Sequence, residues 1–291
     1  VLDLAACIKE VKKKLGHEKV VLAGWSGGGS LSLFYQSQAE NPTLTSTPAG
    51  DPPNLKDADL PKADGLMLLA AHCSRATTLT EWLDPSITDE SQPENREREF
   101  NLYDPLNPNQ PPYSEDFIKE YRKKQIERNK RITDWALAKL ESFRGDPTKE
   151  YGFAVHGTMA DPRWLDPKQE PNDRKAGWCY LGDPKVVNDS PIGLSRFSSI
   201  RSWLSQFSYE LSEADGEKCG RSTTVPTLVI GNSADDACPP SHNQRLYNSI
   251  THERRKLHIV KGANHYYFGQ QEELAEAVNV SLDWLKEEDL I

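Results

Sequence analysis

One short stretch, residues 19–30, limits what this chain can fold into more than any other part of the sequence. It reads as an apolar run, then a Gly-x-Ser-x-Gly turn centred on Ser26, and then the first residues of a helical pattern. Valine and leucine before the turn favour a buried strand, and the apolar spacing of residues 31–35 favours a helix after it. Small residues around a serine allow the strand and helix backbones to approach closely. The sequence therefore predicts a sharp strand–turn–helix unit with Ser26 at its tip.

This predicted turn gives Ser26 the surroundings of a nucleophile. The helix that follows would point its N-terminus at the serine, where partial positive charge favours a developing oxyanion. The backbone N–H of Gly27 is the expected donor to that oxyanion. A Gly-x-Ser-x-Gly sequence is also common as a flexible turn, so the interpretation depends on finding a base and a carboxylate elsewhere in the chain.

Further strands and helices fit the same type of fold. Apolar, β-branched runs predict strands at 19–23, 64–72, 226–231 and 256–260, and amphipathic spacing predicts helices at 1–15, 27–40, 242–250 and 271–286. The last of these helices carries Leu274, Val278, Leu282 and Leu285 on one face. Strands that alternate with helices at this spacing are typical of parallel α/β units. The predicted fold class is therefore α/β, with a mostly parallel sheet flanked by helices.

The sheet pattern stops between residues 73 and 224. Within this span a long helix is predicted at 114–143, with Ser114 as its N-cap. Five tryptophans fall in the span, and we expect most of them to pack its small core and one or two to line a pocket: Trp82, Trp135, Trp164, Trp178 and Trp203. We predict three parts: residues 1–72 form the part of the core with the serine turn, residues 73–224 form a largely helical lid, and residues 225–291 complete the core.

Three polar residues follow three of the predicted strands: Ser26, Asp235 and His265. The carboxyl ends of parallel strands meet at one edge of a sheet, so these side chains are expected to lie together. An imidazole can take the proton of a serine hydroxyl, and a carboxylate can orient the imidazole and stabilise its charged form. Asp236 competes with Asp235 for the role of the acid. The set predicts nucleophilic catalysis by Ser26.

The motifs around these residues resemble those of the α/β-hydrolase fold superfamily. Residues 24–28 resemble its nucleophile elbow, 234–239 its acid loop and 262–266 its histidine loop, in the order Ser, Asp, His. The acid of the family usually lies four residues before a loop proline, so Pro239 favours Asp235. Trp25 and His72 are further candidates for contacts with the substrate, His72 because it ends its strand near the same edge of the sheet. A hydrogen-bonded structural role is the alternative for His72. Residues 73–224 match the family only in position, as its variable lid.

The resemblance implies a serine hydrolase that cleaves an ester, a lactone or a related acyl bond of a small-molecule substrate. An activated C–C bond or an amide is the alternative for the same three residues, and a catalytically silent binding protein is the alternative of another class. The family's earlier strands and the loop with its second oxyanion donor are not found in this sequence. We therefore expect an N-terminal portion of the same enzyme as a partner of these strands.

Composition excludes several other classes of function. The formal net charge of −9 argues against nucleic acid or an anionic membrane as a partner. Five scattered cysteines, odd in number, are typical of reduced thiols in a cytoplasmic protein. No phosphate loop, dinucleotide fingerprint or metal-spaced set of ligands is found, so neither a cofactor nor a metal is expected. His156 lies in a Val-His-Gly-Thr turn with no partner that the sequence identifies.

Overall fold

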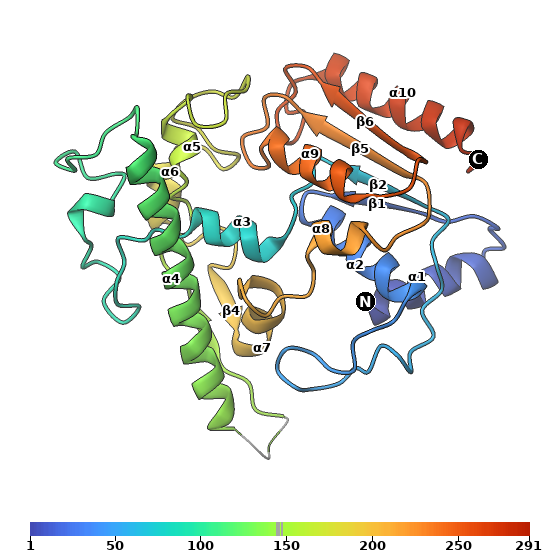
Figure 1. The fold of residues 1–291 in the computed structure, drawn as a ribbon, viewed down its shortest axis with the longest axis horizontal. Helices are drawn as coiled ribbons and strands as arrows, with labels where there is room; N and C mark the ends of the chain where they lie inside the picture. The colour runs from blue at the N-terminus through green and yellow to red at the C-terminus, as the bar shows by residue number, and fades with distance from the viewer. Residues whose placement is uncertain (144–145, 147) are drawn as a thin grey trace. The chain divides into compact units, whose positions relative to one another are not determined.

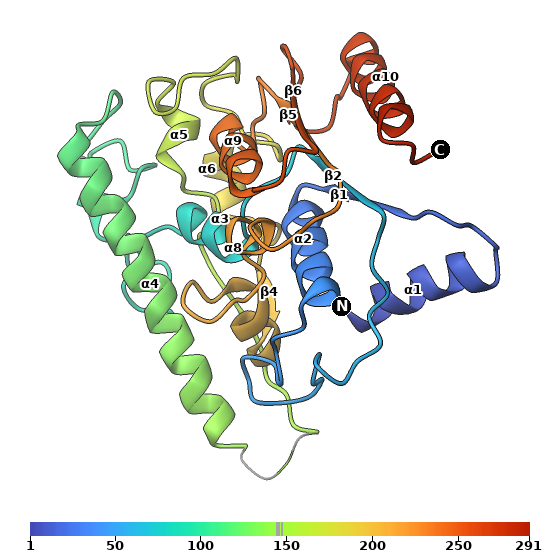
Figure 2. The same ribbon diagram turned by 45° about the vertical axis from the view of Figure 1, so that its right-hand side comes forward.

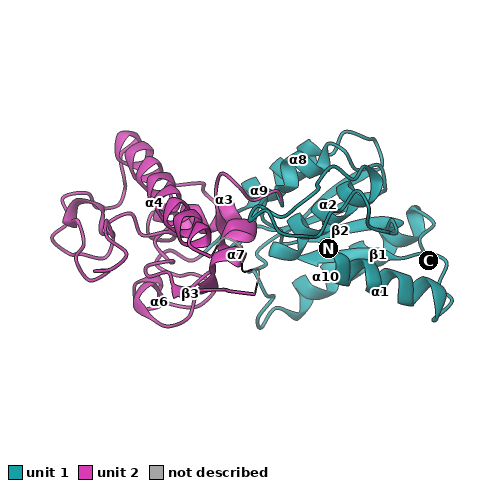
Figure 3. Ribbon diagram, turned by 90° about the horizontal axis from the view of Figure 1, so that it is seen from below, with its two compact units in different colours: residues 1–75, 172–174, 214–291 teal, residues 76–171, 175–213 magenta. Residues whose placement is uncertain are grey.

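The computed structural model describes residues 1–143, 146 and 148–291, which form two compact units. Unit 1 comprises residues 1–75, 172–174 and 214–291, and unit 2 comprises residues 76–171 and 175–213 (Figure 3). All the residues that the sequence proposes for catalysis belong to unit 1. The role of residues 73–224 as a lid stays a prediction.

The centre of unit 1 is a sheet of four parallel strands in the order β1-β2-β5-β6 (Figure 1). These strands are β1 (Val21–Trp25), β2 (Gly65–Leu69), β5 (Thr227–Asn232) and β6 (Arg255–Val260). The four predicted strands and their parallel arrangement are confirmed. In the sheet that the structure describes, β1 is an edge strand, and the expectation of an N-terminal portion beside it stays a prediction.

Helices cover both faces of this sheet. The helices of unit 1 are α1 (Leu2–Lys13), α2 (Gly27–Glu40), α8 (Gly216–Gly220), α9 (Pro240–Ser249) and α10 (Gln271–Glu287). Figure 2 shows the sheet close to edge-on, with α10 on one side and α2 and α9 on the other. This is the layered arrangement that buries the apolar side chains of parallel strands on both faces.

Two buried clusters hold these layers together. On one face, Leu66 and Leu68 of β2 pack with Leu33 of α2 and Ile8 of α1, all nearly inaccessible to solvent. On the other face, the core includes Leu228, Ile230, Val260 and Trp284. Successive strand residues alternate between the two clusters, as the two-residue period of a strand requires.

The buried face of α10 differs from the apolar face that its sequence presents. Leu274, Val278 and Leu282 are 45, 48 and 43% exposed, whereas Ala277 and Trp284 are buried. Ala277 and Trp284 are seven residues apart and share one side of the helix. Burying the large ring of Trp284 against the sheet therefore turns most of the leucine–valine stripe toward solvent.

Unit 2 is largely helical, as predicted, but it also contains a small sheet. Its elements are α3 (Arg75–Trp82, of which Arg75 belongs to unit 1), η1 (Arg98–Phe100), α4 (Glu115–Glu141), β3 (Gly152–Ala154), α5 (Pro162–Leu165), α6 (Pro184–Asp189), β4 (Phe197–Ser199), α7 (Ile200–Ser202) and the π-helix η2 (Trp203–Phe207). Ser114 caps α4, since its hydroxyl accepts a hydrogen bond from the backbone N–H of Phe117 at 3.2 Å. The antiparallel pair β3–β4 was not predicted, because strands of three residues are too short to show a period.

The tryptophans of unit 2 divide into two groups. Trp82, Trp164 and Trp203 are buried, and the rings of Trp82 and Trp164 pack at 5.3 Å between centroids. Trp135 and Trp178 are about two-fifths exposed, at 42 and 41%. The prediction that most of them pack the core of this segment is confirmed.

Every helix among the described residues is either too short or too polar to cross a lipid bilayer.

We predict that Trp284→Ala lowers the free energy of unfolding by about 3–5 kcal/mol, because it empties a large buried site between α10 and the sheet. Leu282→Ala, at an exposed position of the same helix, is the matched control and should change stability by less than about 0.5 kcal/mol. Urea unfolding followed by circular dichroism measures both. Equal losses in the two variants would contradict the finding that α10 packs against the sheet through Trp284 and turns Leu282 toward solvent.

Candidate functional site

The turn between β1 and α2 holds Ser26 in a conformation that side chains rarely adopt. Its φ and ψ angles are 52° and −118°, and its backbone N–H donates to the carbonyl of Leu69 at 2.9 Å. A Cβ atom added to Gly24 would lie 2.3 Å from the backbone oxygen of Gly28. The strand and helix therefore pass too closely for any side chain at Gly24, and this contact fixes the tight turn that carries the serine. A strained serine at such a turn is the geometry of a nucleophile elbow.

Gly27 begins α2 and borders two polar side chains. A Cβ atom at this position would lie 2.8 Å from Nε of Arg75 and 3.1 Å from Nε2 of His72. Sequence reasoning proposed His72 for this neighbourhood but missed Arg75. Arg75 lies six residues beyond the end of β2, at the start of α3. Its local sequence is no different from that of an ordinary solvent-exposed arginine, so the sequence gives no signal for this position.

His72 is a buried, neutral imidazole beside the elbow. Burial, followed by the charges of the neighbouring His242 and Arg75, lowers its pKa to about 3. Its backbone N–H donates to the carbonyl of Ser26 at 3.4 Å. Its Nδ1 atom has no hydrogen-bond partner within the part of the chain that the structure describes. An imidazole with so low a pKa can donate or accept a hydrogen bond near neutral pH without adding charge to the site.

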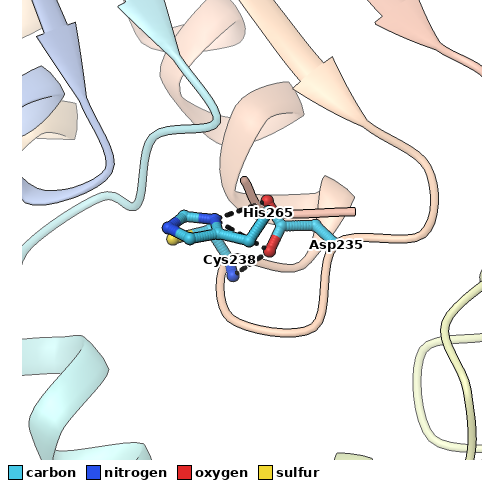
Figure 4. Close-up of side chains that lie close together, drawn as sticks. All are labelled: Asp235, Cys238 and His265. Carbon is cyan, nitrogen blue, oxygen red and sulfur yellow. Dashed lines mark hydrogen bonds and ion pairs between the residues drawn. The ribbon is translucent and has the colours of Figure 1, made fainter. Parts of the chain in front are cut away.

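Asp235 and His265 are joined by a buried hydrogen bond (Figure 4). Nδ1 of His265 lies 3.0 and 3.1 Å from the two carboxylate oxygens of Asp235, and both residues are at most 2% exposed. Because a carboxylate only accepts, Nδ1 carries the proton. The backbone N–H groups of Ala237 and Cys238 also donate to Oδ1 of Asp235, at 2.8 and 2.7 Å. The loop after β5 thus fixes the carboxylate, and the carboxylate orients the ring.

The pKa values around this pair follow from its burial and charge. Burial alone would lower the pKa of His265, but the charge of Asp235 and the hydrogen bond to it outweigh burial and raise the pKa above its ordinary value. For Asp236, burial and then repulsion by Asp235 raise the pKa. Of the two aspartates that the sequence proposed, Asp235 hydrogen-bonds with the imidazole, whereas Asp236 accepts from the backbone N–H of His265.

Cys238 connects the acid loop to the elbow, a contact that the sequence did not predict. Its Sγ atom lies 3.7 Å from Oγ of Ser26 and is completely buried. A ring nitrogen of His265, a carboxylate oxygen of Asp235 and Sγ of Cys238 lie within 4.8 Å of one another, so by distance alone these atoms are also potential metal ligands. Since Asp235 and His265 already satisfy each other, we interpret the group as an acid–base pair with an adjacent thiol (Figure 4).

Aromatic rings surround the imidazole. The ring of Trp25 packs edge-on against His265 at 6.2 Å and against Tyr267 at 5.8 Å between centroids. Tyr266 meets the His265 ring at 4.7 Å and is more than half exposed. Trp25, which the sequence proposed as a substrate contact, thus lies against the proposed base. These packed rings restrict the rotation of His265.

Residues 172–174 return to unit 1 and brace the acid loop. The side-chain amide of Asn172 donates to the backbone oxygen of Asp235 at 3.4 Å. The carboxylate of Asp173 accepts from Ser233 and Lys261, both at 2.5 Å. Because Ser233 and Lys261 follow β5 and β6, this short segment ties together the loops that carry Asp235 and His265.

Comparison with known proteins finds similarity in structure only. No protein-family model matches the chain, and no curated protein is similar to it in sequence. Among solved structures, it is similar to the monoacylglycerol lipase of Paleococcus ferrophilus, with 14% identity over 99% of this chain and 75% of that chain, at a TM-score of 0.46. It is also similar to the esterase domain of a Rhodothermus marinus protein, with 13% identity over 98 and 68% of the two chains, at a TM-score of 0.43. A third similar structure is the α/β hydrolase GrgF from Penicillium sp., with 13% identity over 99 and 72%, at a TM-score of 0.46.

The fold itself is α/β-hydrolase-like, as the sequence predicts. The parallel sheet, the tight turn at Ser26 between β1 and α2, and the loops after β5 and β6 that carry Asp235 and His265 establish this arrangement within unit 1.

We predict that Gly24→Ala lowers the free energy of unfolding by about 1–3 kcal/mol, because the new methyl group meets the backbone at Gly28 rather than a movable side chain. Gly28→Ala is the matched control, since a Cβ at Gly28 meets nothing within 4 Å. This control should leave stability unchanged or raise it by up to about 1 kcal/mol. Thermal unfolding compares the two, and a neutral Gly24→Ala variant would disprove the close approach of strand and helix.

Proposed function

We propose that this chain is a serine hydrolase in which Ser26 attacks the carbonyl carbon of an ester, a lactone or a related acyl compound. The observation that carries the proposal is the buried hydrogen bond between Asp235 and His265, in loops after strands of the same parallel sheet as the Ser26 turn. A small-molecule substrate suits an arrangement in which the reacting groups lie at one edge of a sheet.

The proposed reaction proceeds in two halves. Nε2 of His265 takes the hydroxyl proton of Ser26 as the serine oxygen bonds to the carbonyl carbon, and the imidazolium then gives that proton to the leaving group. The result is an acyl-enzyme on Ser26. In the second half His265 deprotonates a water molecule that attacks the acyl carbon, and the proton returns to Ser26. Asp235 holds Nδ1–H of His265 throughout and stabilises the imidazolium.

Stabilisation of the oxyanion falls to the N-terminus of α2. The N–H of Gly27 is the first donor, in the position that follows the nucleophile. The neutral ring of His72 and the side chain of Arg75 border Gly27 and are the groups that we propose for contact with the developing oxyanion or the substrate. Trp25 acts through His265, because it packs against the ring and holds its orientation.

Two other functions use the same residues. Cleavage of an activated C–C bond or an amide needs the same nucleophile and base, and turnover on a panel of substrates separates these reactions from ester cleavage. A binding protein without turnover is favoured by one observation: the Ser26 hydroxyl contacts Sγ of Cys238, and among the described residues it forms no hydrogen bond with His265, the proposed base. Nucleophile–base hydrogen bonds are often long before substrate binds, so the hydrolase is the proposal that we develop.

We expect Ser26→Ala to lower kcat/KM toward p-nitrophenyl esters and aryl lactones by a factor on the order of 10³ or more, because the nucleophile is lost. Cys238→Ala is the matched control, since it removes the neighbouring thiol and should keep kcat/KM within about tenfold. Initial rates across an ester, lactone and amide panel measure both. The assignment fails if Ser26→Ala keeps its activity, or if Cys238→Ala and not Ser26→Ala abolishes turnover.

The pH profile of kcat/KM should have an acidic limb set by His265. Only the neutral imidazole accepts the serine proton, so activity is lost as pH falls through the pKa of His265. That pKa lies above the ordinary value of 6.5, because the charge and hydrogen bond of Asp235 outweigh the effect of burial. Asp235→Asn should move the limb to lower pH and reduce kcat by about 10⁴-fold. Stopped-flow rates between pH 5 and 9 test this, and an unmoved limb in Asp235→Asn would contradict the role of the carboxylate.

A further inference from the structure

Unit 2 contains a buried guanidinium group, that of Arg196, which forms no ion pair with the described residues, although the charge of Asp189 acts on it from a greater distance. Arg196 is 5% exposed and directly precedes β4, where its backbone pairs with Val155. Its Nη2 atom donates to the carbonyl of Asn188 at 3.0 Å and lies 3.5 Å from the hydroxyl of Thr158. Its Nε–H is buried and has no acceptor in the part of the chain that the structure describes. Among the described residues, no carboxylate lies within 4.0 Å of this side chain.

The neighbouring arginines are neutralised, which makes Arg196 the exception. Arg128 forms a two-pronged ion pair with Glu90 at 2.7 and 2.9 Å. Arg96 pairs with Asp189 at 2.5 Å and with the buried Asp84 at 3.3 Å. The nearby carboxylates are therefore already engaged with other cations. A buried charge is stable only when it is paired, so Arg196 is positioned to pair with a group that is not part of this set of residues.

This guanidinium lines a cavity of about 380 Å³ that lies wholly within unit 2. A cavity of this size matches a small ligand or its head group. The ring of His156 also lines it and, within the described residues, makes no hydrogen bond. Burial and then the charges of Arg196 and Arg128 lower the pKa of His156, so its neutral ring offers one donor and one acceptor near neutral pH.

Two carboxylates on the wall limit the kind of anion that fits. Asp189 is held by Arg96, so its charge is largely compensated. Glu94 is exposed and leaves a negative charge at the cavity surface. A long polyanion would be repelled by this charge, whereas a single compact oxyanion can reach the guanidinium and bind it through two N–H groups.

We propose that this cavity binds the oxyanion head group, a carboxylate or a phosphate, of a small ligand, with Arg196 as its counter-ion and the ring of His156 as a second contact. The site is separate from the proposed catalytic residues, all of which belong to unit 1. It therefore stands whether or not the chain is a hydrolase.

Binding is measured on the full chain with two probes, inorganic phosphate and malonate, against sodium chloride at equal ionic strength. Each anion that binds should raise the midpoint of thermal unfolding in a saturable way, because a ligand that binds only the folded state stabilises it. The same titration should shift the NMR signals of the His156 ring. A response to one probe alone identifies the head group as phosphate or as carboxylate.

Arg196→Met keeps the length of the side chain and removes its charge, and it should weaken anion binding at least tenfold. Arg98→Met is the matched control, since Arg98 belongs to the same unit but its side chain is 60% exposed and paired with Asp104. This control should bind as the unmodified chain does. If Arg196→Met does not fold, the NMR titration of the unmodified chain still tests the proposal, because an anion bound in this cavity should shift the signals of the His156 ring in a saturable way. The absence of a saturable response to either probe, or an equal response in Arg196→Met, would overturn the proposal.

Discussion

The arrangement of the site depends on one steric constraint, the close passage of β1 over the first turn of α2. A side chain at Gly24 would meet the backbone of Gly28, so strand and helix pass too closely for one there, and Ser26 in the turn between them has a strained, positive φ angle. The strain is held by the hydrogen bond from Ser26 to the neighbouring strand and by the packing of α2 against the sheet. The backbone conformation of this turn is therefore enough to place the hydroxyl of Ser26 at the edge of the sheet.

The proposed acid and base, Asp235 and His265, depend on the same sheet in a different way. Asp235 is fixed by backbone N–H groups of its own loop, and His265 is fixed by Asp235 and by the ring of Trp25. The segment that contains Asp173 ties the two loops to each other. The strands thus determine where Asp235 and His265 lie, and short-range hydrogen bonds determine how their side chains are oriented. Such preorganisation is what the proposed reaction requires, because the charge that develops on the imidazole is stabilised without rearrangement.

The sequence predicts the local features of this molecule and the proximity of Asp235 to His265, but it does not predict contacts that depend on how side chains pack in the folded chain. The four strands and the elbow at Ser26 follow from patterns within a few residues, and the structure contains them. The buried face of α10 does not follow from such a local pattern, because it depends on how Trp284 packs against the sheet. The contact between Ser26 and Cys238 joins positions 212 residues apart. Arg196 likewise becomes unusual only once Asp84, Asp189 and Glu90 are seen to pair with other arginines.

The proposed nucleophile can be tested directly by mapping a covalent adduct. The full chain is treated with a fluorophosphonate, digested, and analysed by tandem mass spectrometry. The account predicts one adduct, on Ser26, that forms more slowly as pH falls below the pKa of His265 and is lost in His265→Ala. An adduct on another residue, or no adduct in a folded chain, would contradict the claim that Ser26, His265 and Asp235 form a working catalytic set.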